Sequence, residues 1–194
     1  MHILLGSRSP RRAEIFTQLC IPFRQVPSEF DEEAILFNQD PKSYARELAE
    51  RKAALLAIKY PEDLIVTADT VVHCDGKVYN KPRDLQEAAS FLKDLSGRWH
   101  EVYTAVSARR GSIGYSEVDE TRILFHPLSE EMISLYLKAF LPLDMAGAYA
   151  IQEGGGLLIA RMDGCFYNVM GLSINALKVV LLKMGIDIWN FLKK

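Results

Sequence analysis

ILLGSRSPRR, at residues 3–12, is the most informative segment of this chain. Its three apolar residues predict a strand, and a short polar loop follows them. Ser9 and Pro10 favour the N-cap and the first position of a helix, so the segment predicts a strand, a loop and then a helix. Arg11 and Arg12 fall in the first helical turn, where the helix dipole already favours anions. A bound phosphate explains two arginines there, and a solvated helix start with surface ion pairs is the alternative.

The composition is that of an ordinary soluble protein. The 194 residues are 49% hydrophobic and 25% charged, which is enough for a core in one domain or two small lobes. A net charge of -2 argues against a large nucleic-acid interface. No apolar run reaches the length of a membrane span, and no leader precedes the first strand. We therefore expect a cytoplasmic protein with neither a nucleic-acid nor a membrane partner.

Cysteines and histidines predict neither a disulfide framework nor a zinc site. Cys20, Cys74 and Cys165 are widely spaced and form no C-x-x-C pair. The four histidines share no helical face at the spacing of metal ligands. We expect reduced thiols and no histidine-bound metal.

The order of the elements predicts a mixed α/β fold. We expect helices at residues 10–19, 40–60, 84–97, 129–140 and 173–184, and strands at 23–26, 64–72, 77–79, 99–108 and 115–125. A further hairpin is expected from strands at 157–162 and 165–170 around Asp163-Gly164. No repeat or linker separates these elements, so we assign residues 1–194 to a single domain with a mixed sheet.

Asp69 interrupts the otherwise apolar run at residues 64–72. A lone carboxylate is costly to bury, so this one needs a cation or a metal beside it. The alternative is an aspartate at a strand end that bonds to neighbouring backbone. Because aspartate is a poor strand former, we favour a ligand or catalytic role.

Three other charged sites have less specific signals. Lys81 lies between a strand and a capped helix, where functional loops concentrate, but a solvated lysine is the better interpretation of that residue alone. Lys52, on a helix, is interpreted in the same way. The acidic cluster at residues 29–33, which includes Glu32, is either a solvated loop or a source of oxygen ligands for magnesium.

The segment at residues 144–156 is rich in small residues. Its glycines match neither the dinucleotide-binding fingerprint nor a P-loop, so they allow close approach to a ligand or form a tight loop. Gln152 is polar within this segment. It either reads the edge of a base or satisfies the loop backbone.

Taken in order, these segments resemble the Maf family of nucleoside triphosphate pyrophosphatases. The resemblance covers nearly the whole chain. It rests on Ser7-Arg8-Ser9-Pro10-Arg11-Arg12, Asp31-Glu32, Leu48-Ala49 with Lys52-Ala53, Ala68-Asp69-Thr70-Val71-Val72, Lys81-Pro82, Leu95-Ser96-Gly97, His100-Glu101-Val102-Tyr103-Thr104, Ala146-Gly147-Ala148-Tyr149 with Ile151-Gln152, and Asn168-Val169 with Gly171-Leu172.

The resemblance implies a mixed α/β fold of two lobes around a central cleft, like that of inosine triphosphate pyrophosphatases. It implies hydrolysis of a nucleoside triphosphate at the α-β bond, with Mg²⁺ or Mn²⁺, to the monophosphate and pyrophosphate; a homodimer is compatible with it. The implied catalytic residues are Asp69, Glu32, Lys52 and Lys81, with Glu32 and Asp69 as metal ligands. The implied substrate-binding residues are Ser7, Ser9, Arg11, Arg12 and Gln152.

Within the family, the Gly-Ala-Tyr and Ile-Gln motifs resemble the branch that acts on dTTP, UTP and modified pyrimidine nucleotides. The branch that prefers 7-methyl-GTP usually has Ser and Glu in this segment. Met145, Ala150 and Glu153 depart from the pattern, because lysine is common at the first position and glycine at the other two. The alternatives are a 7-methyl-GTP-preferring pyrophosphatase and a non-catalytic nucleotide-binding regulator of cell division. A phosphotransferase is disfavoured because no P-loop or kinase signature is present.

Overall fold

The computed structural model describes residues 2–192 and divides into two compact units. The first unit comprises the residues up to Asp69, then Thr104–Asp119, then the residues from Gly171 onward. The second unit comprises Thr70–Tyr103 and Glu120–Met170. Three strands contribute residues to both units: β3 (Leu64–Cys74), β5 (Trp99–Arg110) and β6 (Ile113–Phe125).

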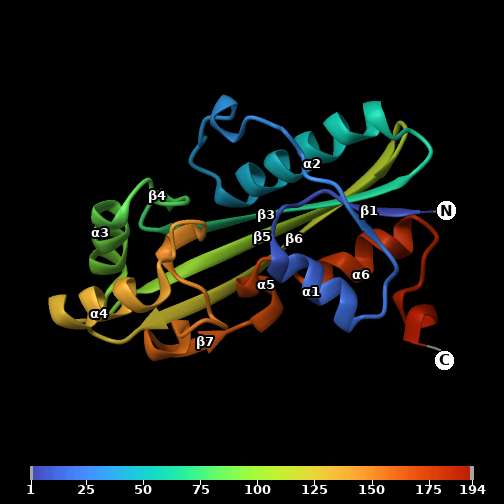
Figure 1. The fold of residues 1–194 in the computed structure, drawn as a ribbon. Helices are drawn as coiled ribbons and strands as arrows, with labels where there is room; N and C mark the ends of the chain where they lie inside the picture. Colours follow the sequence, from blue (N-terminus) through green and yellow to red (C-terminus); the bar gives the residue numbers. More distant parts are fainter. Residues whose placement is uncertain (1, 193–194) are drawn as a thin grey trace. The chain divides into compact units, whose positions relative to one another are not determined.

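The strands form one mixed sheet in the order β2-β1-β3-β5-β6-β7, and β4 pairs with β3 (Figure 1). Parallel pairing joins β1 (Ile3–Leu5) to β2 (Arg24–Gln25) and to β3, with Leu4 opposite Arg24 and Ile65. Antiparallel pairing joins β4 (Lys77–Tyr79) to β3 and β7 (Ile159–Asp163) to β6. The predicted mixed α/β fold is confirmed.

The first unit carries α1 (Pro10–Gln18), α2 (Pro41–Lys59) and α6 (Ile174–Lys183), together with the 3₁₀ helices η1 (Glu32–Ala34) and η4 (Ile188–Leu192). Each of its three α-helices begins after a residue whose side-chain oxygen accepts a backbone N–H of the first turn. One of its apolar clusters packs α2 against β1 and β3 and consists of Leu4, Ala53, Leu56, Ala57 and Ile65.

The second unit carries α3 (Leu85–Leu95), α4 (Glu130–Phe140) and α5 (Phe166–Met170), with η2 (Ala146–Ala148) and η3 (Gly155–Leu157). Its apolar cluster joins α3 and α4 to β5, β6 and the segment around η2. Aromatic rings from all of these parts take part, among them Phe91, Phe125, Tyr136 and Tyr149. The segment before Gln152 is therefore anchored in the core of its unit.

The hairpin expected at residues 157–170 is wrong in its second half. Residues 159–163 form β7 and pair with β6, but residues 166–170 form α5. Asn168 explains the difference, because its Nδ2 donates to the Val102 carbonyl at 2.8 Å and to Thr121 Oγ1 at 3.0 Å. These bonds give the buried NH₂ group two acceptors when the segment is helical.

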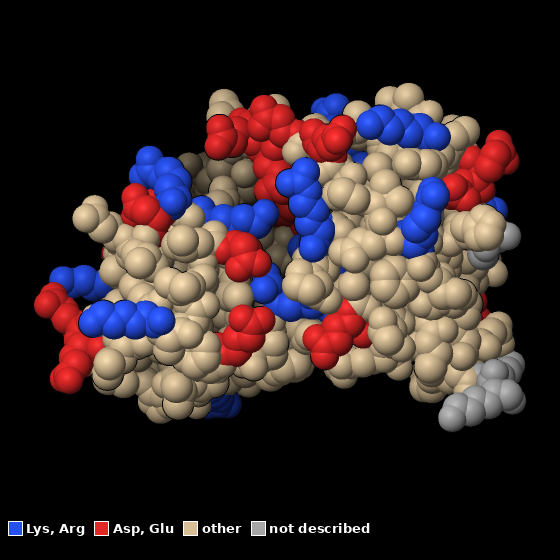
Figure 2. All heavy atoms as spheres, in the orientation of Figure 1, with Lys and Arg blue, Asp and Glu red and all other residues tan. Residues whose placement is uncertain are grey.

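The described residues carry both signs of charge on the same surface. On the face drawn in Figure 2, Lys and Arg side chains are interspersed with Asp and Glu side chains. Within residues 2–192, no helix has both the length and the apolar character needed to cross a membrane.

Candidate active site

The loop between β1 and α1 is held close to β3 and β2. Gly6 donates its N–H to the Val66 carbonyl at 2.7 Å. A Cβ on Gly6 would lie 2.6 Å from side-chain carbons of both α2 and β3, so only glycine fits where the strand becomes the loop. Gln25 donates from Nε2 to the Ser7 carbonyl at 2.8 Å. The loop is thus fixed by partners from two strands.

Arg12 is bound to protein at two nitrogens of its guanidinium. Its Nε donates to the Gly171 carbonyl at 2.7 Å, and Nη1 donates to Ser7 Oγ at 3.3 Å. Ser7 Oγ also accepts the N–H of Ser9, and Ser9 Oγ accepts the N–H of Arg12 as the helix N-cap. The alternative of a solvated helix start is therefore wrong for Arg12, which is a fixed cation.

Lys52 lies between two carboxylates in the first unit. Its Nζ is 2.7 Å from Glu32 Oε1, and it also pairs with Asp69 Oδ1. The Lys52 and Asp69 side chains are each 9% exposed, whereas that of Glu32 is 45% exposed. The three residues come from η1, α2 and β3. The carboxylate within the apolar strand thus has the cationic partner that its burial requires.

The interpretation of Lys52 as a solvated surface lysine is wrong. Lys52 lies four residues after Leu48 and four before Leu56, so it falls on the buried stripe of α2. Thr67 Oγ1 donates to the Ala49 carbonyl at 2.6 Å and ties β3 to α2 just before Lys52. The helical period alone would have placed this lysine on the inner face.

The charges of this cluster act on each other's pKa values. The pKa of Asp69 is raised, chiefly because the carboxyl group is buried. The positive charges of Lys52 and Arg12 lower this pKa, and the negative charge of Glu32 raises it. Burial also lowers the pKa of Arg12, and attraction to Asp69 and Glu32 opposes that change. The guanidinium stays protonated under all ordinary conditions. A carboxylate whose pKa is raised is a better proton acceptor near neutral pH, so Asp69 has the property of a general base.

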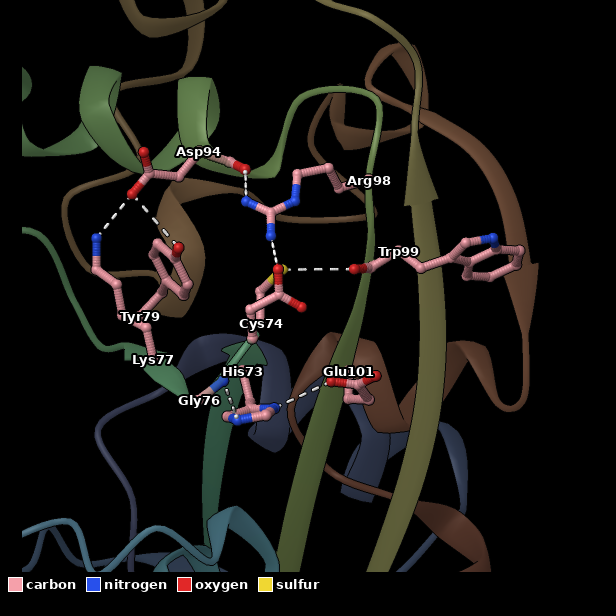
Figure 3. Close-up of polar contacts among 10 residues, drawn as sticks. His73, Cys74, Gly76, Lys77, Tyr79, Asp94, Arg98, Trp99 and Glu101 are labelled. Atoms are coloured by element: carbon pink, nitrogen blue, oxygen red, sulfur yellow. Dashed lines mark hydrogen bonds and ion pairs between the residues drawn. The ribbon is translucent and has the colours of Figure 1, made fainter.

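Lys81 is exposed in the second unit, two residues after β4. The β3–β4 hairpin before it turns at Asp75-Gly76, as predicted. Figure 3 shows how α3 and the residues after it hold this hairpin. Lys77 and the Tyr79 hydroxyl donate to the Asp94 carboxylate at 2.7 Å and 3.3 Å, and burial raises the pKa of Tyr79 to about 12.

His73 lies on β3, the first strand of the hairpin, and bonds to the turn and to β5. Its Nε2 accepts the N–H of Gly76 at 3.1 Å, and its Nδ1 lies 3.0 Å from Glu101 Oε2 (Figure 3). A neutral imidazole that accepts at Nε2 carries its proton on Nδ1, so His73 donates to Glu101. The hairpin that leads to Lys81 is therefore held by Asp94 of α3 and by Glu101 of β5.

Gln152 lies in the loop between η2 and η3 of the second unit. Its Nε2 donates to Glu153 Oε1 at 3.4 Å. Its Oε1 is buried and has no hydrogen-bond partner within the described part of the chain. The side chain thus does not satisfy the loop backbone there, which was one of its two interpretations. A buried amide oxygen without a protein donor is a position where a ligand can donate.

His100 anchors the segment that leads to Gln152. It is fully buried on β5, and its Nε2 lies 3.0 Å from the Tyr149 hydroxyl oxygen. The rings of His100, Phe125 and Tyr149 pack edge-on with centroids 4.7 to 5.6 Å apart. Burial lowers the pKa of His100 to about 4, so the ring is neutral at pH 7.

We expect acid to destabilise the protein through His100. Its folded pKa of about 4 lies below the ordinary value of 6.5, so the unfolded chain takes up the proton first as the pH falls. The free energy of unfolding from this group should fall by about 2 kcal/mol between about pH 7 and pH 5. Urea unfolding at both pH values measures it, with His100→Gln as the variant that does not titrate. An equal pH dependence in the two proteins would contradict the assignment.

The structure brings together the candidates of the first unit. Arg12, Glu32, Lys52 and Asp69 interact electrostatically, and Ser7 and Ser9 are bonded to Arg12. Arg11 acts on Arg12 through its charge. Lys81 and Gln152 belong to the second unit. Local spacing does not identify Gln25 and Thr67 as supporting residues, because each meets its partner only through the fold. His100 stands in one of the family motifs, but its contact with Tyr149 is likewise visible only in the structure.

Known proteins match this chain over most of its length. Residues 2–184 match the family described as Maf-like protein. The chain belongs to the Maf family. A relative from Chlamydia felis, named dTTP/UTP pyrophosphatase, is 41% identical over 191 residues, which are 98% of this chain and 97% of the relative. One from Carboxydothermus hydrogenoformans, with the same name, is 43% identical over 176 residues, which are 90% and 94% of the two chains.

The Maf resemblance inferred from the sequence motifs is therefore confirmed. Among solved structures, this Maf protein is similar to the Staphylococcus aureus Ham1 protein with a TM-score of 0.45 and 10% identity, over 65% of this chain and 71% of that one.

Proposed function

We propose that this Maf protein hydrolyses dTTP and UTP to the nucleoside monophosphate and pyrophosphate. The observation that carries the proposal is Lys52 held between Asp69 and Glu32, with Arg12 acting on the same carboxylates. Binding a triphosphate requires cations, but two carboxylates among them add a repulsion that binding alone does not need. Hydrolysis needs both, because a group must also take the proton of the attacking water. Relatives aligned over nearly the whole chain are named dTTP/UTP pyrophosphatase.

We propose that two carboxylates of the first unit hold a divalent metal ion. Glu32 and Asp69 direct carboxylate oxygens at the same Lys52 Nζ, so a single cation can be reached by both. No group of three His, Cys, Asp or Glu side chains able to hold a metal occurs among residues 2–192. Mg²⁺ is usually held by one or two carboxylates and completed by substrate phosphates. We propose Glu32 and Asp69 as its ligands. When bound, Mg²⁺ or Mn²⁺ would offset phosphate charge and polarise water.

The cations are proposed to bind the triphosphate. The planar guanidinium groups of Arg11 and Arg12 suit pairs of phosphate oxygens, and Lys52 of the same unit supplies a point charge. Ser7 and Ser9 contribute at the start of α1, where the backbone N–H groups and the dipole favour anions.

Asp69 is proposed to take the proton of the attacking water. The water oxygen then bonds to the α-phosphorus on the side opposite the α-β bridging oxygen. The bond between the α-phosphorus and this bridging oxygen breaks, and pyrophosphate leaves with its electron pair. The cations stabilise the negative charge that grows on the leaving group. The raised pKa of Asp69 suits this role.

Gln152 is proposed to read the base. Its amide has one donor end and one acceptor end, which match the edge of uracil or thymine. A guanine methylated at N7 suits this amide less well. We therefore expect dTTP or UTP to have a higher kcat/KM than 7-methyl-GTP and GTP.

The variant Gln152→Glu should change this ranking. It places a second carboxylate beside Glu153 and removes the amide donor, so kcat/KM for UTP should fall about tenfold or more. One panel of dTTP, UTP, GTP and 7-methyl-GTP at one metal concentration measures it, with product separation in each case. A wild-type preference for 7-methyl-GTP, or an unchanged ranking in the variant, would show that Gln152 does not read the base. Absence of pyrophosphate from every nucleotide would favour a binding regulator instead.

A further inference from the structure

The first unit carries a cavity of about 410 Å³ whose lining includes none of the residues proposed for hydrolysis. Six of its seven lining residues fall on one face of α2, between Ser43 and Ala54, at the spacings of three and four that bring helical side chains together. The seventh is Arg109 on β5. Lys52 belongs to the buried stripe of the same helix, so it and the cavity lie on different faces of α2. A volume of this size is large enough for a small molecule.

The two carboxylates that line the cavity are already engaged by protein donors. Arg51 Nη2 donates to Glu47 Oε1 at 3.2 Å and forms an ion pair across one turn of α2. Glu50 Oε1 accepts the hydroxyl of Ser116 on β6. Because Glu47 and Arg51 offset each other's charge, the lining keeps two further cations against one further carboxylate.

Those two cations are Arg46 and Arg109, and no carboxylate within residues 2–192 forms an ion pair with either. Arg46 Nε is buried and has no hydrogen-bond partner among these residues. Hydrogen bonds from Ser43 lower the pKa of Asp40, and the charge of Arg46 adds to this effect through space. Arg109 Nε donates to the Gly111 carbonyl at 2.9 Å, which fixes the side chain without pairing its charge to a carboxylate. A bound anion would supply the acceptors and the charge that both guanidinium groups lack.

We propose that this cavity is a second anion site, which binds a small molecule through a phosphate group. The planar fork of a guanidinium matches two oxygens of one phosphate, and two arginines oppose its double charge. Ala54 is the one apolar residue of the lining, which contains no aromatic ring. The cavity therefore favours neither an apolar ligand nor a stacked base, and the phosphate group is the part of the ligand that it recognises.

Titration calorimetry with inorganic pyrophosphate, in buffer without Mg²⁺, tests the site in the wild type, Arg46→Gln and Arg109→Gln. Each variant should weaken pyrophosphate binding at the cavity about tenfold or more, because each removes charge-assisted hydrogen bonds to the anion. Arg46 and Arg109 come from different elements, so one variant can serve if the other does not fold. Pyrophosphate release from UTP should stay within about twofold of wild type in both.

The matched control is Lys59→Gln, which removes a cation of α2 that does not line the cavity and should leave pyrophosphate binding unchanged. Inorganic phosphate should compete with pyrophosphate, whereas acetate at the same concentration should not, because a phosphate carries more charge and more acceptor oxygens than one carboxylate. Equal competition by acetate would show that the cavity does not select phosphate.

Pyrophosphate affinities within about twofold of wild type in both arginine variants would overturn the inference. It would also fail if Arg12→Gln removed the same binding, since pyrophosphate would then occupy the proposed active site. A wild-type protein that binds pyrophosphate at the cavity but releases none from UTP would contradict the proposed function alone and leave the second anion site supported.

Discussion

Asp69→Asn lowers the turnover of UTP by about a hundredfold or more in our account. The amide keeps the shape of the side chain but accepts no proton and weakens metal binding. The fold should survive, because Lys52 keeps Glu32 as an ion-pair partner when the Asp69 charge is removed. Initial rates of pyrophosphate release measure the activity, and urea unfolding of the same preparation measures stability.

The matched control for Asp69→Asn is Glu62→Gln, an exposed carboxylate in the same unit. It should keep both activity and stability. If Asp69→Asn retains activity within about threefold of wild type, Asp69 has only a structural role.

Lys52→Met is expected to have the largest effect on stability. It removes the cation between Glu32 and Asp69 and leaves the buried Asp69 carboxylate without its main partner. Breaking a buried pair in this way costs about 3 kcal/mol of unfolding free energy. Urea unfolding at neutral pH measures the loss, and turnover should fall too because a cation proposed to bind the triphosphate is gone.

Lys59→Met is the control on the same helix. Lys59 pairs with Glu29 at 3.4 Å, but both side chains are more than half exposed. Its replacement should cost less than about 1 kcal/mol. If the two variants lose equal stability, the buried pair around Lys52 does not contribute as proposed.

Much of the fold was predictable because local and tertiary signals agree. Asp84, Ser129 and Ser173 are N-cap residues by sequence, and each accepts a first-turn N–H in the structure. The Asp75-Gly76 turn has positive φ at both residues, as its sequence favours.

The mistaken strand at residues 165–170 shows where local patterns fail. A short apolar run fits a strand or a buried helical turn equally well. The decision is made by Asn168, whose partners Val102 and Thr121 are 66 and 47 residues away. No local pattern carries that information.

The candidate site also contains residues that were predictable from local sequence and residues that were not. Asp69 was predictable because a carboxylate in an apolar strand demands a partner. Its partner Lys52 was not identified from composition, although its place on the buried stripe of α2 was available. The contact of Gln152 with Glu153 depends on a tight turn that spacing alone does not reveal.

The most direct test of the proposed reaction follows the oxygen of the attacking water. Hydrolysis of UTP with Mg²⁺ in water enriched in heavy oxygen, followed by mass spectrometry of the separated products, identifies the phosphorus that is attacked. We predict UMP with one heavy oxygen and unlabelled pyrophosphate. UDP with orthophosphate, or a label in pyrophosphate, would contradict attack at the α-phosphorus.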